Sequence, residues 1–268
     1  MRIAATLAVL SLAAAASAQD AEKPEEPVVY GFEVAAPAFP SGVERARQPD
    51  LWMLDVEFKP MRMRYVDVTD PKTGQTKREQ VWYLVYRVYN RPIRGAEIKS
   101  DTVPINELDE PLTRPLFMPR LTLITYDRPG QEIPQQTIQD DLSKQIVSQL
   151  AKIENRRDVQ VKGSLDLLGE LPPAADDVKP VYGIAIFRGV DPDADFFKVV
   201  MRGFTNVYKI QDEGDGKRVY RKALVQRFSR RGDRYDPSQI EFEFIGDPEW
   251  TYLPAEKVQD DDVIAASE

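Results

Sequence analysis

The feature that most constrains the fold is the run Val81-Trp82-Tyr83-Leu84-Val85-Tyr86-Arg87-Val88-Tyr89-Asn90, which is almost entirely aromatic or β-branched. Such side chains fit a pleated, buried surface, so the run predicts a central β-strand. Alternate side chains of a strand point to opposite faces. One face therefore holds Trp82, Leu84, Tyr86 and Val88. The other face, with Val81, Tyr83, Val85, Arg87 and Tyr89, is also mostly apolar, so both faces need cover.

Similar segments recur along the chain, with turn signals between them. Residues 51–58 alternate apolar and acidic side chains, and residues 61–68 continue as strand up to the turn Asp70-Pro71-Lys72-Thr73-Gly74. Proline presets φ and glycine permits positive φ, so this turn predicts a hairpin between residues 61–68 and 79–90. Further strands are expected at 28–34, 116–126, 159–168, 181–190, 196–210, 219–228 and 240–245. The last three of these predict an antiparallel meander.

Residues 138–155 have the pattern of an α-helix. Thr137 and Asp140 resemble a capping box, and apolar side chains then follow at helical spacing. This stripe consists of Ile138, Leu142, Ile146, Leu150 and Ile153. We expect the helix to pack across the second face of the central strand, against Tyr83 and Val85. The alternative cover for that face is another protein or a ligand.

Two short motifs resemble those of a known class of domain. Tyr86-Arg87-Val88-Tyr89-Asn90 is similar to a Y-x-V-x-N strand ending, and Gly183-Ile184-Ala185-Ile186-Phe187 to a later G-x-A-x-F strand, in exported bacterial immunoglobulin-like domains. The chain lacks both cysteines of antibody-type domains, and the helix would be an insertion. The resemblance implies a binding or envelope role and transfers no catalytic residue.

Together these patterns predict an all-β fold, an immunoglobulin-like antiparallel β-sandwich with one inserted α-helix at about residues 138–155. Many short strands, regular turn signals and the single helix favour this class. The sequence shows no internal repeat. We place the sandwich in one domain over residues 28–253; the alternative is two domains with a boundary in the region 129–156.

The N-terminal residues predict export. Met1-Arg2 is positive, residues 3–16 are apolar, and Ala16-Ser17-Ala18 matches a signal-peptidase site. We therefore expect a signal peptide over residues 1–18 and a periplasmic or extracellular protein. Residues 19–27 predict a disordered leader, and residues 254–268 an acidic disordered tail. No later stretch is long and apolar enough to predict a transmembrane segment.

The charge pattern argues against a nucleic-acid partner. The formal net charge of the chain is −8, of which residues 19–28 carry −3 and residues 256–268 carry −4. The acidity therefore lies mainly in the two terminal segments, and the rest of the chain is nearly balanced. Nothing in the sequence resembles the basic footprint of a nucleic-acid-binding protein.

The absence of two residue types narrows the chemistry. The chain contains no histidine and no cysteine, which removes nucleophile–histidine machinery and zinc sites built on imidazole or thiolate. Asp191-Pro192-Asp193-Ala194-Asp195 has alternating acids, but Phe196 and Arg202 stand where a calcium loop needs glycine and glutamate. We therefore predict no cofactor and no metal site, and any enzyme here would have to use carboxylates, lysine, tyrosine or a hard metal.

Five residues are candidates for binding. Tyr83, Arg87 and Tyr89 lie on the second face of the central strand, which becomes a binding surface if the helix does not cover it. Arg227 and Arg230 belong to a basic cluster with Arg231 and Arg234 that could contact an anionic glycan, although a solvated strand end is the simpler interpretation. The tripeptide Arg231-Gly232-Asp233 fits a hairpin turn better than an adhesion motif.

Two functional hypotheses remain. The first is a non-catalytic exported envelope protein that acts by surface contact with another protein or an envelope glycan, in a structural, adhesive or assembly role. The second is a carbohydrate-active enzyme that uses Asp/Glu acid–base chemistry. Two converging carboxylates and exposed aromatic rings in a cleft would favour the enzyme. Isolated acids, none with a raised pKa, would favour the contact protein.

Overall fold

A computed structural model describes residues 31–48, 50–93, 116–155, 159–214, 216–230 and 240–255. The expected signal peptide and leader lie outside these residues, as do Arg231, Arg234 and the tripeptide 231–233. Of the expected tail, only Pro254 and Ala255 are described, and Pro254 ends a strand. The strand expected at 28–34 is described only from residue 31, and its last residue begins β1 (Val34–Ala36).

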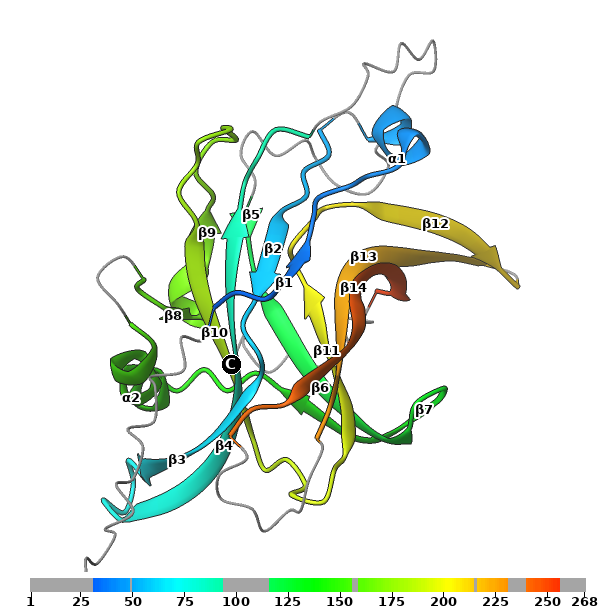
Figure 1. Ribbon diagram of the computed structural model, residues 1–268. Helices are drawn as coiled ribbons and strands as arrows, with labels where there is room; N and C mark the ends of the chain where they lie inside the picture. Colours follow the sequence, from blue (N-terminus) through cyan, green and yellow to red (C-terminus); the bar gives the residue numbers. More distant parts are fainter. Residues whose placement is uncertain are drawn as a thin grey trace, which may run out of the picture. The chain divides into compact units, whose positions relative to one another are not determined.

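The first of two large sheets is built around β4, the predicted central strand (Figure 1). β3 pairs with the first half of β4 and β2 with its last residues, while β10 lies along its other side. All pairs are antiparallel except that of β8 with β10. The strands of this sheet are β1, β2 (Asp55–Phe58), β3 (Arg62–Thr69), β4 (Thr76–Tyr89), β8 (Lys162–Gly163) and β10 (Val181–Arg188).

The second sheet is built around β13. β11 and β12 pair with successive parts of one side of β13, and β14 pairs with the other side. The sheet continues from β11 to β6 and β7. Its strands are β6 (Arg120–Arg128), β7 (Gln131–Gln139), β11 (Phe196–Arg202), β12 (Tyr208–Glu213), β13 (Gly216–Ser229) and β14 (Glu243–Pro254). Outside the two sheets lie a small pair, β5 (Leu116–Phe117) with β9 (Gly169–Glu170), and the helices α1 (Gly42–Arg47), η1 (Ser164–Leu167) and α2 (Lys144–Glu154).

The main core lies between the two sheets, and the predicted face of β4 is its centre. The Trp82 ring lies 4.9 Å from that of Phe197 on β11 and 4.5 Å from that of Phe242, centroid to centroid. The ring of Tyr86 lies over Gly183, its partner on β10, so a Cβ atom on Gly183 would overlap Tyr86 Cζ. The all-β sandwich with an inserted helix is therefore confirmed, and the glycine of the G-x-A-x-F motif has a packing role.

The predicted hairpin and meander are also confirmed. β3 pairs with β4 from Arg62 opposite Tyr83 to Thr69 opposite Thr76. Gly74 in the connecting turn has φ of 69°, a conformation that glycine adopts readily. In the meander, β12, β13 and β14 follow one another antiparallel. The last of these strands is longer than expected, because it runs from Glu243 to Pro254.

The helix begins later than predicted. Residues 131–139 form β7, in which Ile138 lies opposite Leu123 of β6 and packs against the main core. Beyond β7, Asp140 accepts a hydrogen bond from the Ile186 N–H (2.7 Å), and the Asp141 N–H donates to Ile186 O (2.7 Å). These bonds hold the chain extended, so α2 starts only at Lys144 and the capping box expected at Thr137 does not form. The prediction was wrong here because strand pairing outweighed helical periodicity.

α2 nevertheless covers the second face of β4, as predicted. Ile146 and Leu150 form a second core cluster with the outward-facing side chains of β4 and β10, namely Val81, Tyr83, Val85, Ile184 and Ile186. Leu142 and Ile153 do not take part: they are 51 % and 43 % exposed. The central strand is therefore buried on both faces, by the second sheet on one side and by the helix on the other.

A buried ionic cluster fastens the end of α2 to the sheet. Glu154, at 2 % exposure, accepts hydrogen bonds from Lys59 Nζ (2.9 Å), Arg62 Nη1 (2.5 Å) and Tyr83 Oη (2.9 Å). Arg62 Nε also donates to Glu241 Oε1 at 2.7 Å. The two cations thus face two carboxylates, and the charges balance inside the protein.

The strand predicted over residues 159–168 is only partly present. Lys162–Gly163 forms β8, and the chain then turns into η1 over Ser164–Leu167. α2 packs directly on this segment, since a Cβ atom on Gly163 would lie 2.8 Å from Val147 Cγ2. The 159–168 prediction was therefore wrong beyond residue 163, because the packing of the helix was not visible in the local sequence.

Candidate functional site

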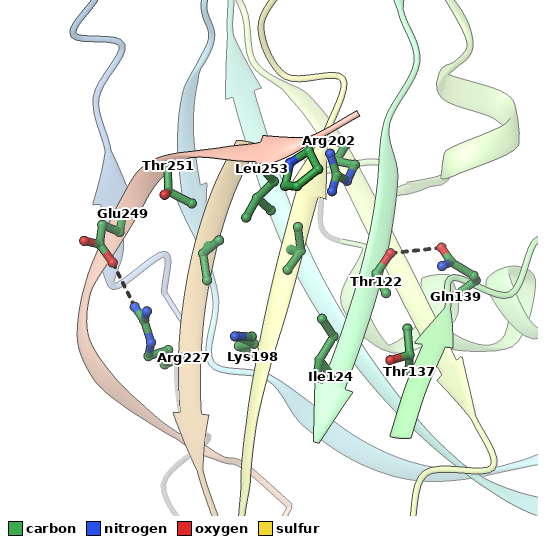
Figure 2. A pocket seen from close by; sticks show the side chains of 13 residues that line it. Thr122, Ile124, Thr137, Gln139, Lys198, Arg202, Arg227, Glu249, Thr251 and Leu253 are labelled. Atoms are coloured by element: carbon green, nitrogen blue, oxygen red, sulfur yellow. Dashed lines mark hydrogen bonds and ion pairs between the residues drawn. The ribbon is translucent and has the colours of Figure 1, made fainter. Parts of the chain in front are cut away.

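The second sheet carries a groove of about 440 Å³ on its outer face, the side away from the core. Figure 2 shows side chains from five strands lining it, with β14 forming one wall. The lining residues are Thr122 and Ile124 of β6, Thr137 and Gln139 of β7, Lys198, Val200 and Arg202 of β11, Val225 and Arg227 of β13, and Glu249, Thr251, Leu253 and Pro254 of β14.

Strand alternation gives the groove an apolar floor between charged side chains. Val200 lies opposite Val225 of β13 and Thr122 of β6, so the centre of the floor is aliphatic. Two residues along β11 in either direction, the same face carries Lys198 and Arg202. Ala223, Ile124 and Leu253 complete the small apolar cluster around Val200 and Val225.

An ion-pair chain borders one end of the groove. Lys198 and Arg227 lie opposite each other on β11 and β13, and Glu132 of the β6–β7 hairpin binds both. The distance from Arg227 Nε to Glu132 Oε1 is 2.6 Å, and Arg227 Nη1 lies 3.0 Å from Glu249 Oε2. Two neighbouring cations are thus held in place by two carboxylates.

These ion pairs keep the carboxyl group of Glu132 ionised. Burial alone would raise the pKa of Glu132, but hydrogen bonds from Lys198 and Arg227 outweigh it and lower the pKa below its usual value. The bond of Arg227 to Glu132, with a further bond to Glu249, raises the pKa of Arg227. Glu132 therefore works as a fixed negative charge and is a poor proton donor near neutral pH.

The lining residues that come from β6 and β7, on the side of the groove opposite β14, are uncharged. Thr122 Oγ1 donates to Gln139 Oε1 at 2.9 Å, and the hydroxyl groups of Thr137 and Thr251 lie across the floor from each other (Figure 2). Hydroxyl and amide groups both donate and accept hydrogen bonds. The groove therefore offers an apolar strip between a charged margin and a hydrogen-bonding margin, which suits an amphipathic partner.

The five binding candidates from the sequence lie in four places. Tyr83 is buried beneath α2 and bonded to Glu154, so its side chain does not reach the surface. Arg87 and Tyr89 lie farther along the outer face of the first sheet. Arg227 alone lines the groove, and Arg230 is buried with its side chain donating to Pro192 O.

Arg87 and Tyr89 belong to a row of cation–π contacts and ion pairs. The Arg87 guanidinium lies 4.3 Å from the centroid of the Phe32 ring and 5.5 Å from that of Tyr89, and its Nε donates to Glu57 Oε2 at 2.7 Å. The guanidinium group of Arg91 also lies over the Tyr89 ring, 4.1 Å from its centroid. These contacts fill the part of the first sheet that α2 leaves uncovered.

The carboxyl group with the clearest raised pKa lies away from the groove. Burial raises the pKa of Asp140 to about 7, and its carboxyl group is bonded to Ser164 Oγ and the Ile186 N–H. Ser164 is itself buried. This acid fixes the chain between β7 and α2, and it does not line the groove.

Sequence reasoning missed most of the groove. Arg227 was noticed because arginines cluster around it, but Lys198, Glu132 and Glu249 come from three other strands. The alternation Lys198-Val199-Val200-Met201-Arg202 does show that β11 has one wholly apolar face and one face with charged ends. Only the packing of the two sheets shows which face of β11 points outward.

Two features are absent from the residues that the structure describes. No group of three or more acidic side chains in that part of the chain is placed to hold a metal ion. In the same residues, no helix is long and apolar enough to cross a bilayer. Comparisons of the chain with protein-family models, curated proteins and solved structures find no match, so the immunoglobulin-like resemblance stays a prediction.

Proposed function

We propose that this is an exported, non-catalytic protein of a bacterial envelope, which acts by surface contact through the groove of the second sheet. Its partner is another envelope protein or an envelope glycan, in a structural, adhesive or assembly role. The export part rests on residues 1–18 and the contact part on the groove.

The single observation that supports contact over catalysis is the state of the acids at the groove. Glycoside hydrolysis needs one carboxylic acid with a raised pKa beside a second carboxylate. Here Glu132 has a lowered pKa, and both Glu132 and Glu249 are bound to Arg227. The lining residues include no aromatic ring. Such a site can bind a partner, but it holds no acid ready to donate a proton.

Site-specific photocrosslinking in the producing cell tests the contact role. A photoreactive amino acid at Thr251, on the groove wall, should give adducts with one discrete envelope component. The same amino acid at Lys72, in the exposed turn of the other sheet, is the matched control and should give none. A bulky Thr137→Trp change on the opposite margin should remove the Thr251 adduct. Equal adducts at both positions, or none at Thr251, would refute the contact role.

An assay for released sugars on the purified protein distinguishes the contact role from catalysis. Incubated with envelope polysaccharides, it should release no reducing ends. If sugars are released and Glu132→Gln or Glu249→Gln abolishes the release, the carbohydrate-active enzyme replaces our proposal.

Export has its own test. The intact mass of the protein recovered from the periplasm or medium should correspond to a chain beginning at Gln19. A protein that remains in the cytoplasm with residues 1–18 attached would contradict export.

A further inference from the structure

β12 is an edge of the second sheet and extends with the first half of β13 as a two-stranded ribbon (Figure 1, gold). Natural edge strands are commonly protected against further pairing by proline, a bulge, very short length or charged side chains. The charges of β12 are of both signs and match in one pairing register, described below. β12 has six residues, and its sequence Tyr-Lys-Ile-Gln-Asp-Glu contains no proline. It pairs with β13 without a register shift. It is therefore a regular edge to which another strand can add.

The backbone groups that face outward from this edge can be identified. Val207 O accepts from the Lys222 N–H at 2.8 Å, so the polar groups of Val207 point toward β13. Because the direction alternates along a strand, those of Tyr208, Ile210 and Asp212 point outward. The Tyr208 N–H confirms this, since it donates to Gln48 Oε1 at 3.2 Å. In the part of the chain that the structure describes, the outward groups of Ile210 and Asp212 have no strand beside them.

One symmetric register satisfies these groups. Two copies of an edge strand related by a two-fold axis pair antiparallel around a central residue. With Gln211 at the centre, Ile210 of each copy lies opposite Asp212 of the other and exchanges both hydrogen bonds. Centring on Ile210 instead would require the Tyr208 N–H, which is already bonded to Gln48.

The same register matches the charges. With Gln211 at the centre, Lys209 of one copy lies opposite Glu213 of the other, twice across the axis. These are pairs without mutual backbone bonds, in which side chains come closest. Glu213 is more than half exposed and forms an ion pair with Arg218, which is itself exposed. Opposite charges stabilise such cross-strand pairs, and like charges destabilise them.

We propose that β12 pairs with β12 of a second copy of this chain, antiparallel and centred on Gln211, which joins the two second sheets into one continuous sheet. The interface is isologous, because each copy contributes the same surface. It lies on the edge of the sheet and leaves the outer face with the groove uncovered. The dimer would therefore present two grooves.

A single cysteine tests the register. The chain contains no cysteine, so a covalent dimer of Gln211→Cys can form only through that residue. Directly opposite residues in a pair without backbone bonds have Cα atoms about 4.5 Å apart, within disulfide range. Oxidation should cross-link Gln211→Cys at least about tenfold faster than Glu213→Cys, whose copies would lie about four residues apart along the strands. Equal rates for the two variants would overturn the register.

Charge reversal tests the pairing without new covalent bonds. Lys209→Glu and Glu213→Lys should each raise the dimer dissociation constant at least about tenfold in sedimentation velocity, since two charge pairs become repulsive. The double variant restores opposite charges and should return to within about threefold of the original value. Lys72→Glu, in a distant exposed turn, is the control and should change nothing.

These experiments can either support or overturn the pairing through β12. A protein that stays monomeric up to about millimolar concentration overturns the proposal. A dimer that none of the three charge variants affects is formed by another surface, and this also overturns it. Rescue by the double variant shows that the single variants were folded and that the loss was electrostatic.

Discussion

The ionic cluster at the end of α2 allows a quantitative prediction. Glu154 accepts bonds from Lys59, Arg62 and Tyr83 and is 2 % exposed. Glu154→Gln removes the charge while keeping the size. It leaves Lys59 and Arg62 buried without the carboxylate that they share, although Arg62 keeps its bond to Glu241. Breaking a buried pair in this way costs about 3–5 kcal/mol. Since a domain is stable by about 5–15 kcal/mol, the variant should fold but be much less stable.

Urea denaturation followed by circular dichroism measures this loss. The control is Lys152→Gln, which removes an exposed charge two residues earlier in the same helix and should change stability by less than about 0.5 kcal/mol. A loss below about 1 kcal/mol in Glu154→Gln would refute the reasoning. It would mean that the two cations reach water when the carboxylate is gone, and that they are not confined inside the protein.

The acid limb of the stability curve provides a second readout. Burial alone would raise the pKa of Glu154, but Arg62 and Lys59 outweigh it and hold the pKa below the usual 4.5. A carboxyl group with a depressed pKa stabilises the fold above its unfolded pKa, and this contribution is lost as the pH falls through the folded value. Stability should therefore fall less below pH 4.5 in Glu154→Gln than in the unchanged protein.

Three further predictions concern single side chains. Folding raises the pKa of Asp140 from 3.8 to about 7, so the free energy of unfolding should fall, by at most roughly 4 kcal/mol, as the pH rises from 3.8 to 7. Asp140→Asn should remove this fall in urea titrations at several pH values. Ile146→Asp should lose more than about 3 kcal/mol of stability because it places a charge in the second core, whereas Leu142→Asp, on the exposed side, should lose less than about 1 kcal/mol by the same assay. Gly183→Ala should lower the melting temperature by several degrees, since its Cβ would overlap the ring of Tyr86. An unchanged melting temperature would show that the Tyr86 ring can move aside without cost.

The fold was predictable where a pattern had only one physical solution. The run from Val81 to Asn90 has two apolar faces, so it had to lie between two layers, and the only amphipathic helix in the sequence was available as the second cover. The Asp70–Gly74 turn fixed its hairpin for the same reason, because its residues suit one local conformation. Predictions of this kind depend on neighbours in sequence.

Other features depended on partners distant in sequence. Ile138 fits a helical stripe and a strand equally well, and its pairing with Leu123 decided the outcome. The groove also depends on residues distant in sequence, since its charged margin is formed by Lys198, Glu132 and Arg227 from three strands. One local signal was overlooked: Ser41-Gly42-Val43-Glu44 has the spacing of a capping box and does cap α1.

The order in which the chain visits the two sheets bears on how the protein is made. It passes between them three times, after β4, after β7 and after β10. Neither sheet can therefore assemble from a continuous fragment. Phe242, whose ring lies 4.5 Å from that of Trp82, follows strands β1 to β13 in the sequence. Such long-range pairing is slow. We expect the nascent chain to stay open until β11 to β14 have been made, and to complete its sandwich only then. The export that we propose would need such an open state, because a translocation channel threads an unfolded chain.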